Sequence, residues 1–174
     1  MLHHIGGGRP AADAVELLLD CHARIRSFLD LAGRLGASTA LGPDEVAEAA
    51  TQVRRYFSLA LPLHARDEED SILPRLAGLD PEVDLALEAM RREHREHEAP
   101  VASLVDLCAR VADAPDLLAT LAPRLAAAST RLAADMEGHL LLEERTVFPA
   151  ARRLLGAAAG EAVVREMRAR RAGG

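Results

Sequence analysis

The chain has 174 residues, which is enough for one domain with a buried core. Hydrophobic residues make up 49% of it, mostly Ala and Leu, and aromatic residues only 2%, so the composition favours helices over sheets. The net charge of −6 argues against nucleic acid as the main partner, and no apolar run approaches the roughly 18 residues that a membrane helix needs.

The first ten residues contain a glycine run and lack the apolar stretch of a signal peptide, so we expect residues 1–10 to be a flexible N-terminus. His3 and His4 lie in this segment and are not expected to bind a metal. Cys21 and Cys108 form no CxxC pair and suggest no disulfide framework. We therefore expect a cytoplasmic protein in a reducing environment, as a monomer or a weak homodimer.

The first two helices follow from hydrophobic periodicity and proline position. Over residues 11–35, apolar residues recur at i, i+3, i+4 and i+7, which predicts an amphipathic helix. Pro43 stands at a favourable first helical position, and the second helix is expected to run from there to about Leu76. Pro62 lies inside this second helix and should kink it or free a carbonyl, and Pro74 is expected to mark its fraying end.

The second half of the chain repeats this organisation. Asp80 is an N-cap followed by Pro81, which predicts the start of a third helix that closes at about residues 112–115. A fourth helix is expected over about 116–155, a break over 156–160, and a short final helix over 161–171. The fold class is therefore all-α: an up-down-up-down four-helix bundle over residues 11–158, with a short C-terminal helix and tail over 159–174.

One motif occurs twice, 75 positions apart. His64–Pro74 reads HARDEEDSILP and His139–Pro149 reads HLLLEERTVFP, and both fit H-x3-E-E-x2-[I/V]-[L/F]-P. Residues four apart lie on the same face of a helix, so each copy presents an imidazole beside a carboxylate. That donor pair suits iron, manganese or zinc. Two copies with matching flanks are far more specific than one HxxxE.

A histidine also precedes each copy at a similar interval, because His22 lies 42 residues before His64 and His94 lies 45 residues before His139. A histidine in an apolar seam is usually a satisfied core residue, but this repetition makes both of them candidate ligands. Four helices around one axis would then bring together four imidazoles and two carboxylates, which suits two metal ions. A carboxylate can bridge two ions and an imidazole cannot, so Glu68 and Glu143 are predicted as bridges.

In this arrangement His22 and His64 bind one ion, and His94 and His139 bind the other. The alternative is a hydrogen-bonded network without metal, which would bury two carboxylates side by side at a cost of several kcal/mol each. Glu69 and Glu144 directly follow the bridging residues. Because they are rotated by about 100° around the helix, they are predicted to be solvated or to support a ligand rather than to bind metal.

The pattern H…HxxxE…H…HxxxE, with a proline after each HxxxE, resembles the hemerythrin-like, or HHE cation-binding, family over roughly residues 14–155. The resemblance implies a four-helix bundle that holds two iron ions, bridged by the two glutamates and an oxo or hydroxo group. It also implies small ligands such as O2, H2O2 or NO. The candidate metal ligands are His22, His64, Glu68, His94, His97, His139 and Glu143.

The chain departs from the oxygen-carrying hemerythrins, which are known for H-x3-H on the third helix and H-x4-D on the fourth. Here Glu98 follows His94 at +4, and His97 lies 75 residues after His22. His94, His97 or Glu98 can therefore complete the coordination of the second ion. Fewer histidines leave more room for exogenous ligands. This favours peroxide or nitric oxide chemistry, catalase-like or peroxidase-like, over reversible oxygen carriage. A protein that binds or senses oxygen or iron without turnover, and a metal-stabilised scaffold, are the alternatives.

Overall fold

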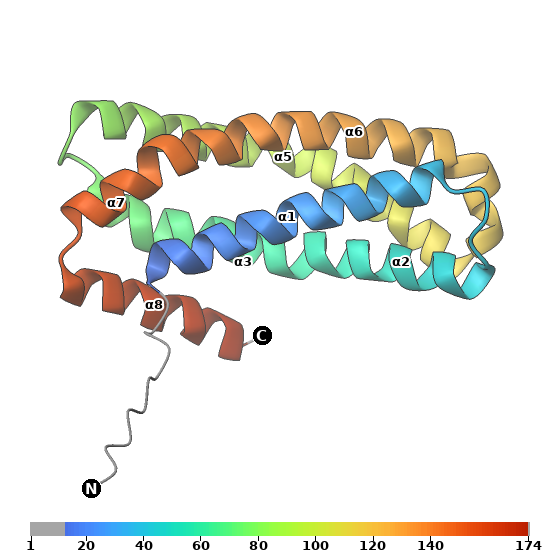
Figure 1. Ribbon diagram of the computed structural model, residues 1–174, viewed down its shortest axis with the longest axis horizontal. Helices are drawn as coiled ribbons and strands as arrows, with labels where there is room; N and C mark the ends of the chain where they lie inside the picture. The colour runs from blue at the N-terminus through green and yellow to red at the C-terminus, as the bar shows by residue number, and fades with distance from the viewer. Residues whose placement is uncertain (1–12, 174) are drawn as a thin grey trace, which may run out of the picture.

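The computed structural model describes residues 13–173, in which four long helical rods run antiparallel to their neighbours in the chain and a fifth helix lies along the side of the bundle near one end (Figure 1). The expected all-α fold class is confirmed, because residues 13–173 contain no β-strand. No helix in this part of the chain combines the length and the apolarity that a membrane crossing requires. The expectations for residues 1–10, including His3 and His4, lie outside the described residues.

The rods correspond to the following elements. The first is α1 (Ala14–Ala37); the second joins α2 (Pro43–Arg55), η1 (Tyr56–Ala60), α3 (Leu61–Arg66), η2 (Asp67–Ile72) and α4 (Leu73–Leu76). The third is α5 (Pro81–Asp113), and the fourth joins η3 (Pro115–Leu117), α6 (Leu118–Leu142), η4 (Glu143–Val147) and α7 (Phe148–Leu154). The fifth helix is α8 (Ala157–Ala172).

Side-chain caps explain where the rods begin. The Asp13 carboxylate accepts from the backbone N–H of Glu16 at 2.7 Å, and the Glu16 carboxylate accepts from the N–H of Asp13 at 3.2 Å, which forms a capping box. Asp80 caps α5 by accepting from the N–H of Glu82 at 3.0 Å. These caps satisfy amide groups that have no partner within the helix, and so define its first turn.

Three short π-helical segments interrupt the second and fourth rods, and each ends two residues before a proline: Pro62, Pro74 or Pro149. Proline lacks an N–H and its ring crowds the carbonyl four residues earlier, so the preceding turn widens to hydrogen bonds that span five residues. The distortion expected at Pro62 is therefore observed as η1. Pro74 lies in the last turn of the rod, which ends at Leu76 as expected.

A polar layer divides the apolar core into two clusters. One contains Ile25, Leu104 and Leu125, and the other contains Leu18 and Met90; all five are fully buried. Each such side chain contributes roughly 1.5–3 kcal/mol by leaving water. Because Leu18 and Ile25 lie about two turns apart on α1, on either side of His22, the layer between the clusters is held in place from both sides.

The C-terminal helix is longer than the sequence pattern indicates. We expected it over residues 161–171, with a break over 156–160, but α8 begins at Ala157 and Gly160 lies within its first turn. Val163 and Met167 are buried, so α8 packs its apolar side against the bundle. In Figure 1 it lies beneath the N-terminal half of α1, beside the second rod.

Candidate metal centre

Six ionisable side chains from all four rods converge in the polar layer: His22 on α1, His64 on α3, Glu68 in η2, His94 on α5, His139 on α6 and Glu143 in η4. They form two overlapping groups. His22, His64, Glu68 and Glu143 make one, and Glu68, His94, His139 and Glu143 make the other, with candidate ligand atoms within 4.8 Å of one another in each group. The two glutamates belong to both groups, as a bridging role requires.

Each of the four histidines points its Nε2 atom at a glutamate oxygen. In the first group, Nε2 of His22 lies 3.1 Å from Glu143 and Nε2 of His64 lies 3.5 Å from Glu68. In the second, Nε2 of His94 lies 3.3 Å from Glu68. Nε2 of His139 lies 3.0 Å from Glu143. The Nε2 atoms and the carboxylate oxygens therefore surround a common space.

The two central carboxylates are buried without hydrogen bonds. Both oxygens of Glu68 and both oxygens of Glu143 lack a hydrogen-bond partner among residues 13–173, as does Nε2 of His22 and of His64. The nearest polar neighbours of these carboxylates are histidine Nε2 atoms at 3.0–3.9 Å. Burial of an ionised carboxylate without a hydrogen bond or a cation costs several kcal/mol. A cation that accepts electron pairs from these atoms would remove that cost, so the residues present fit a metal site.

Local backbone geometry is the same at the two glutamates. The carbonyl of Glu68 accepts from the N–H of Leu73, and the carbonyl of Glu143 accepts from the N–H of Phe148, five residues on in each case. The central glutamate thus lies at the start of the widened turn in both copies of the motif: Glu143 is the first residue of η4 and Glu68 the second residue of η2. Such π-helical turns occur often at functional sites, and here the proline that ends each motif accounts for them.

The second glutamate of each motif supports a histidine of the other half. His22 Nδ1 donates to Glu144 at 2.8 Å, and His94 Nδ1 donates to Glu69 at 2.7 Å. A carboxylate on Nδ1 fixes the ring orientation and leaves Nε2 free to bind a metal. The support role that the sequence left open for Glu69 and Glu144 is thereby observed, and it explains why the motif contains two consecutive glutamates.

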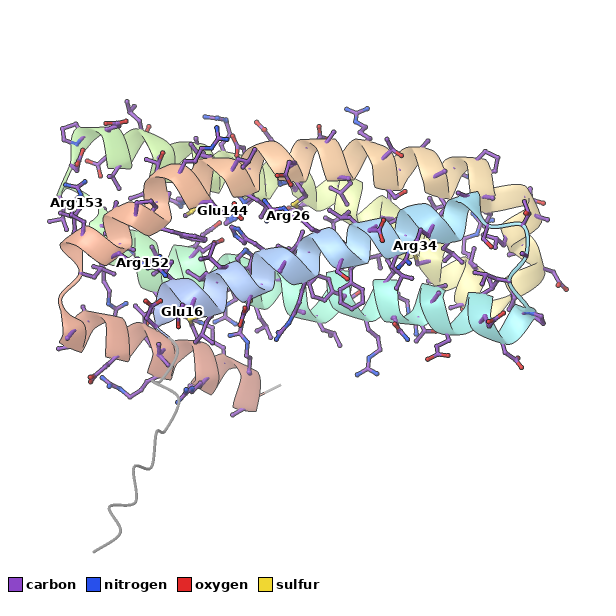
Figure 2. All side chains as sticks on the ribbon, in the orientation of Figure 1. Glu16, Arg26, Arg34, Glu144, Arg152 and Arg153 are labelled. Carbon is purple, nitrogen blue, oxygen red and sulfur yellow. The ribbon has the colours of Figure 1, made fainter. Side chains whose placement is uncertain are left out.

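The sequence did not predict two further residues that support the histidines. Glu93 accepts from Nδ1 of His139 at 3.0 Å. Arg26 donates to Glu144 at 2.8 Å and also to Glu137 at 2.8 Å, and so holds the glutamate that orients His22 (Figure 2). The only signal for Glu93 is its position immediately before the leading histidine of its half. Nothing in the sequence relates Arg26, on α1, to the distant glutamates.

The buried carboxylates shift the pKa values of the histidines around them. Burial lowers the pKa of His22, but the nearby carboxylates of Glu143 and Glu68 outweigh it and raise the pKa to about 10. The pKa of His94 is raised to about 9 against the effect of burial, chiefly by Glu68. Burial dominates at His64, whose pKa is lowered although Glu68 acts in the opposite direction. Protonated His22 and His94 would therefore lie against the same carboxylate oxygens that a cation would bind.

His97 and Glu98, the other candidates for the second ion, lie outside both groups. The His97 ring packs edge-on against His139 with centroids 5.3 Å apart, and Glu98 is exposed. Both line a cavity of about 410 Å³ that also reaches His64 and His94. The cavity is therefore lined by three histidines of the cluster, His64, His94 and His139, and by charged residues such as Arg95 and Glu98.

The matches to known proteins agree with this geometry. A family model described as the hemerythrin HHE cation binding domain matches residues 13–127. An uncharacterised protein of Haemophilus influenzae is 26% identical over 89 residues, which are 47% of this chain. The match spans about half the length of that relative, 49%. The segment matched by the family model includes His22, His64, Glu68 and His94 and ends before the second HxxxE motif.

Proposed function

This chain belongs to the hemerythrin HHE cation-binding family, and from that premise we propose that it binds two iron ions and, through them, small oxidants. One ion would be held by His22 and His64 and the other by His94 and His139, with Glu68 and Glu143 bridging the two. Imidazole and carboxylate donors suit iron; they also suit zinc and manganese, and the family points to iron among these.

The observation that carries the proposal is the set of four carboxylate oxygens of Glu68 and Glu143 that are buried without a hydrogen bond. Each of these two glutamates faces imidazole nitrogens from both metal-binding groups. Two cations would neutralise the two carboxylates and use the electron pairs of all four Nε2 atoms. Hydrophobic clusters on both sides keep the six side chains in place for this.

The cavity indicates the size of the exogenous ligand. It is bounded by Ile25, Phe57 and Met136 next to the histidines, and by charged residues at its rim. Six protein donors leave open positions on two ions, and bound iron would polarise and reduce a small molecule there. Nδ1 of His97 is buried without a partner, and burial lowers the pKa of His97, so its ring is neutral and offers a hydrogen bond to a polar ligand. O2, H2O2 and NO are the ligand class we propose.

Metal content is the first test. Protein loaded anaerobically with Fe(II) and then desalted should retain two irons per chain and, after oxidation, absorb in the region of oxo-bridged iron. Glu68→Gln should reduce the iron content, because a neutral amide is a poor bridge. Glu98→Gln, at the exposed end of the cavity, is the matched control and should retain two irons. Fewer than two irons in the unmodified protein, or equal losses in both variants, would contradict the proposal.

Turnover is tested separately on the loaded protein. Oxygen release from added peroxide above the rate of free iron would indicate catalase-like activity. Release no faster than with free iron would exclude it. A stable oxygenated spectrum that lasts for minutes would instead identify a protein that binds oxygen without turnover.

A further inference from the structure

We propose that the two metal positions are unequal and that the ion held by His22 and His64 is the exchangeable one. The inference rests on the proposed di-iron function and concerns how tightly each ion is held. It follows from a comparison of the supporting residues in the two halves. These differ although the six ligand positions are matched.

The first difference lies behind His64 and His139, which occupy equivalent positions in the two motifs. His139 Nδ1 donates to the Glu93 carboxylate at 3.0 Å, whereas Nδ1 of fully buried His64 has no partner among residues 13–173. Glu93 immediately precedes the leading histidine of its half, and the residue that precedes the leading histidine of the other half is Cys21. The carboxylate that strengthens one imidazole as a donor therefore has no counterpart for the other.

The second difference lies behind the leading histidines. Glu144, which accepts from His22, also accepts from Arg26 at 2.8 Å, so part of its negative charge is already neutralised. Glu69, which accepts from His94 at 2.7 Å, has no arginine partner in the described part of the chain. An acceptor that is shared with a guanidinium polarises its imidazole less. His22 is consequently the weaker donor of this second pair as well.

The position in the first half that matches Glu93 carries no carboxylate. Cys21 stands there, and Nη2 of Arg171, which lies 4.0 Å from its Sγ, is paired with the Asp67 carboxylate at 2.7 Å. Because Asp67 compensates this guanidinium charge, the inference rests on the two differences above. Both weaken the site formed by His22 and His64. Removal of one supporting partner typically costs 10–100-fold in metal affinity, so we expect a difference of roughly that size between the two ions.

Release kinetics test the inference. Fe(II)-loaded protein is mixed under anaerobic conditions with an excess of a ferrous chelator, and the coloured complex is followed by stopped flow. Two phases of one iron each are expected, with rate constants that differ by roughly 10–100-fold. Glu93→Ala should accelerate the slow phase until it approaches the fast one. Glu96→Ala, at an exposed position on the same helix, and Cys21→Ser, which supplies no carboxylate, should leave both phases unchanged.

Each alternative result overturns the inference. Release of both irons in a single phase would show that the positions are equivalent. Acceleration of the fast phase by Glu93→Ala, or no change at all, would show that Glu93 does not cause the difference in release rate. A change in the fast phase with Cys21→Ser would show that the thiol supports His64. Failure of the di-iron function itself looks different, because that protein would hold fewer than two irons at the start. Circular dichroism of each variant confirms the fold independently of metal release.

Discussion

The docking of α8 depends on a buried carboxylate, and removal of its partners provides a stringent test of the structure. Asp67 is fully buried and directly precedes Glu68 in the chain, and its two carboxylate oxygens lie 2.8 Å from Nη1 of Arg170 and 2.7 Å from Nη2 of Arg171. The perturbation is the double variant Arg170→Gln/Arg171→Gln, which leaves this carboxylate without a counter-charge.

The expected loss can be worked out from burial. Leaving one partner of a buried ion pair uncompensated costs about 3–5 kcal/mol. Arg171 is 38% exposed, so water screens its contribution, and we expect the lower end of that range, about 3 kcal/mol. The loss has a ceiling, because α8 can detach and let water reach Asp67. Deletion of residues 157–174 removes Val163 and Met167 and exposes the surface of the bundle against which they pack. The stability of this truncated chain therefore gives the largest loss that detachment of α8 can cause.

The assay is urea unfolding of the metal-free protein, followed by circular dichroism and compared through the free energy of unfolding. Arg165→Gln/Arg168→Gln is the matched control, since both of these arginines are exposed on the same helix and should change stability by less than about 1 kcal/mol. The reasoning is refuted if the two double variants differ by less than about 1 kcal/mol. It is also refuted if the Arg170/Arg171 variant is less stable than the truncated chain.

Two further predictions concern metal uptake and helix packing. Because the pKa of His22 is about 10 and that of His94 about 9 without metal, both rings are protonated at pH 7, and the pKa of His139 is raised as well. Metal affinity should therefore rise with pH, and at least two protons should be released per loaded chain, read with a pH indicator; no release would contradict this prediction. Gly36→Ala places a methyl group 2.6 Å from the backbone nitrogen of Ala126, so it should destabilise the protein by about 1–3 kcal/mol in thermal unfolding. In Gly33→Ala the new methyl group has no neighbour closer than 3.8 Å, so this substitution should be neutral or stabilising by up to about 1 kcal/mol. Equal effects of the two substitutions would contradict the close approach of α1 and α6 at Gly36.

The site illustrates how far residue spacing carries a prediction. The repeated HxxxE motif and the matching intervals before it predicted that His22, His64, His94 and His139 would meet around two glutamates, and these side chains do meet. The prediction worked because helical periodicity fixes which residues share a face, and the bundle brings such faces to one axis. Whether these residues bind iron stays a proposal.

The supporting residues show where residue spacing stops being informative. Glu144 and His22 are 122 positions apart, and Arg26 and Glu137 are 111 apart, so no local pattern relates them. Their pairing depends on the rotation of α6 and η4 about their axes and on the close approach of α1. At Pro74 the sequence predicted the end of the second helix, and the rod does end at Leu76. What residue spacing did not predict is the widened turn of η2, which accommodates the proline ring.

The amino-acid order by itself determined the all-α class, the four rods and the six polar positions that face their common axis, because each of these depends on contacts within one or two helical turns. Only the tertiary structure decided which carboxylate supports which imidazole, that His97 lines the cavity outside the two groups, and that His64 lacks the acceptor that His139 has. Those outcomes depend on the relative rotation and separation of whole helices, and that is set by the packing of the two apolar clusters on either side of the polar layer.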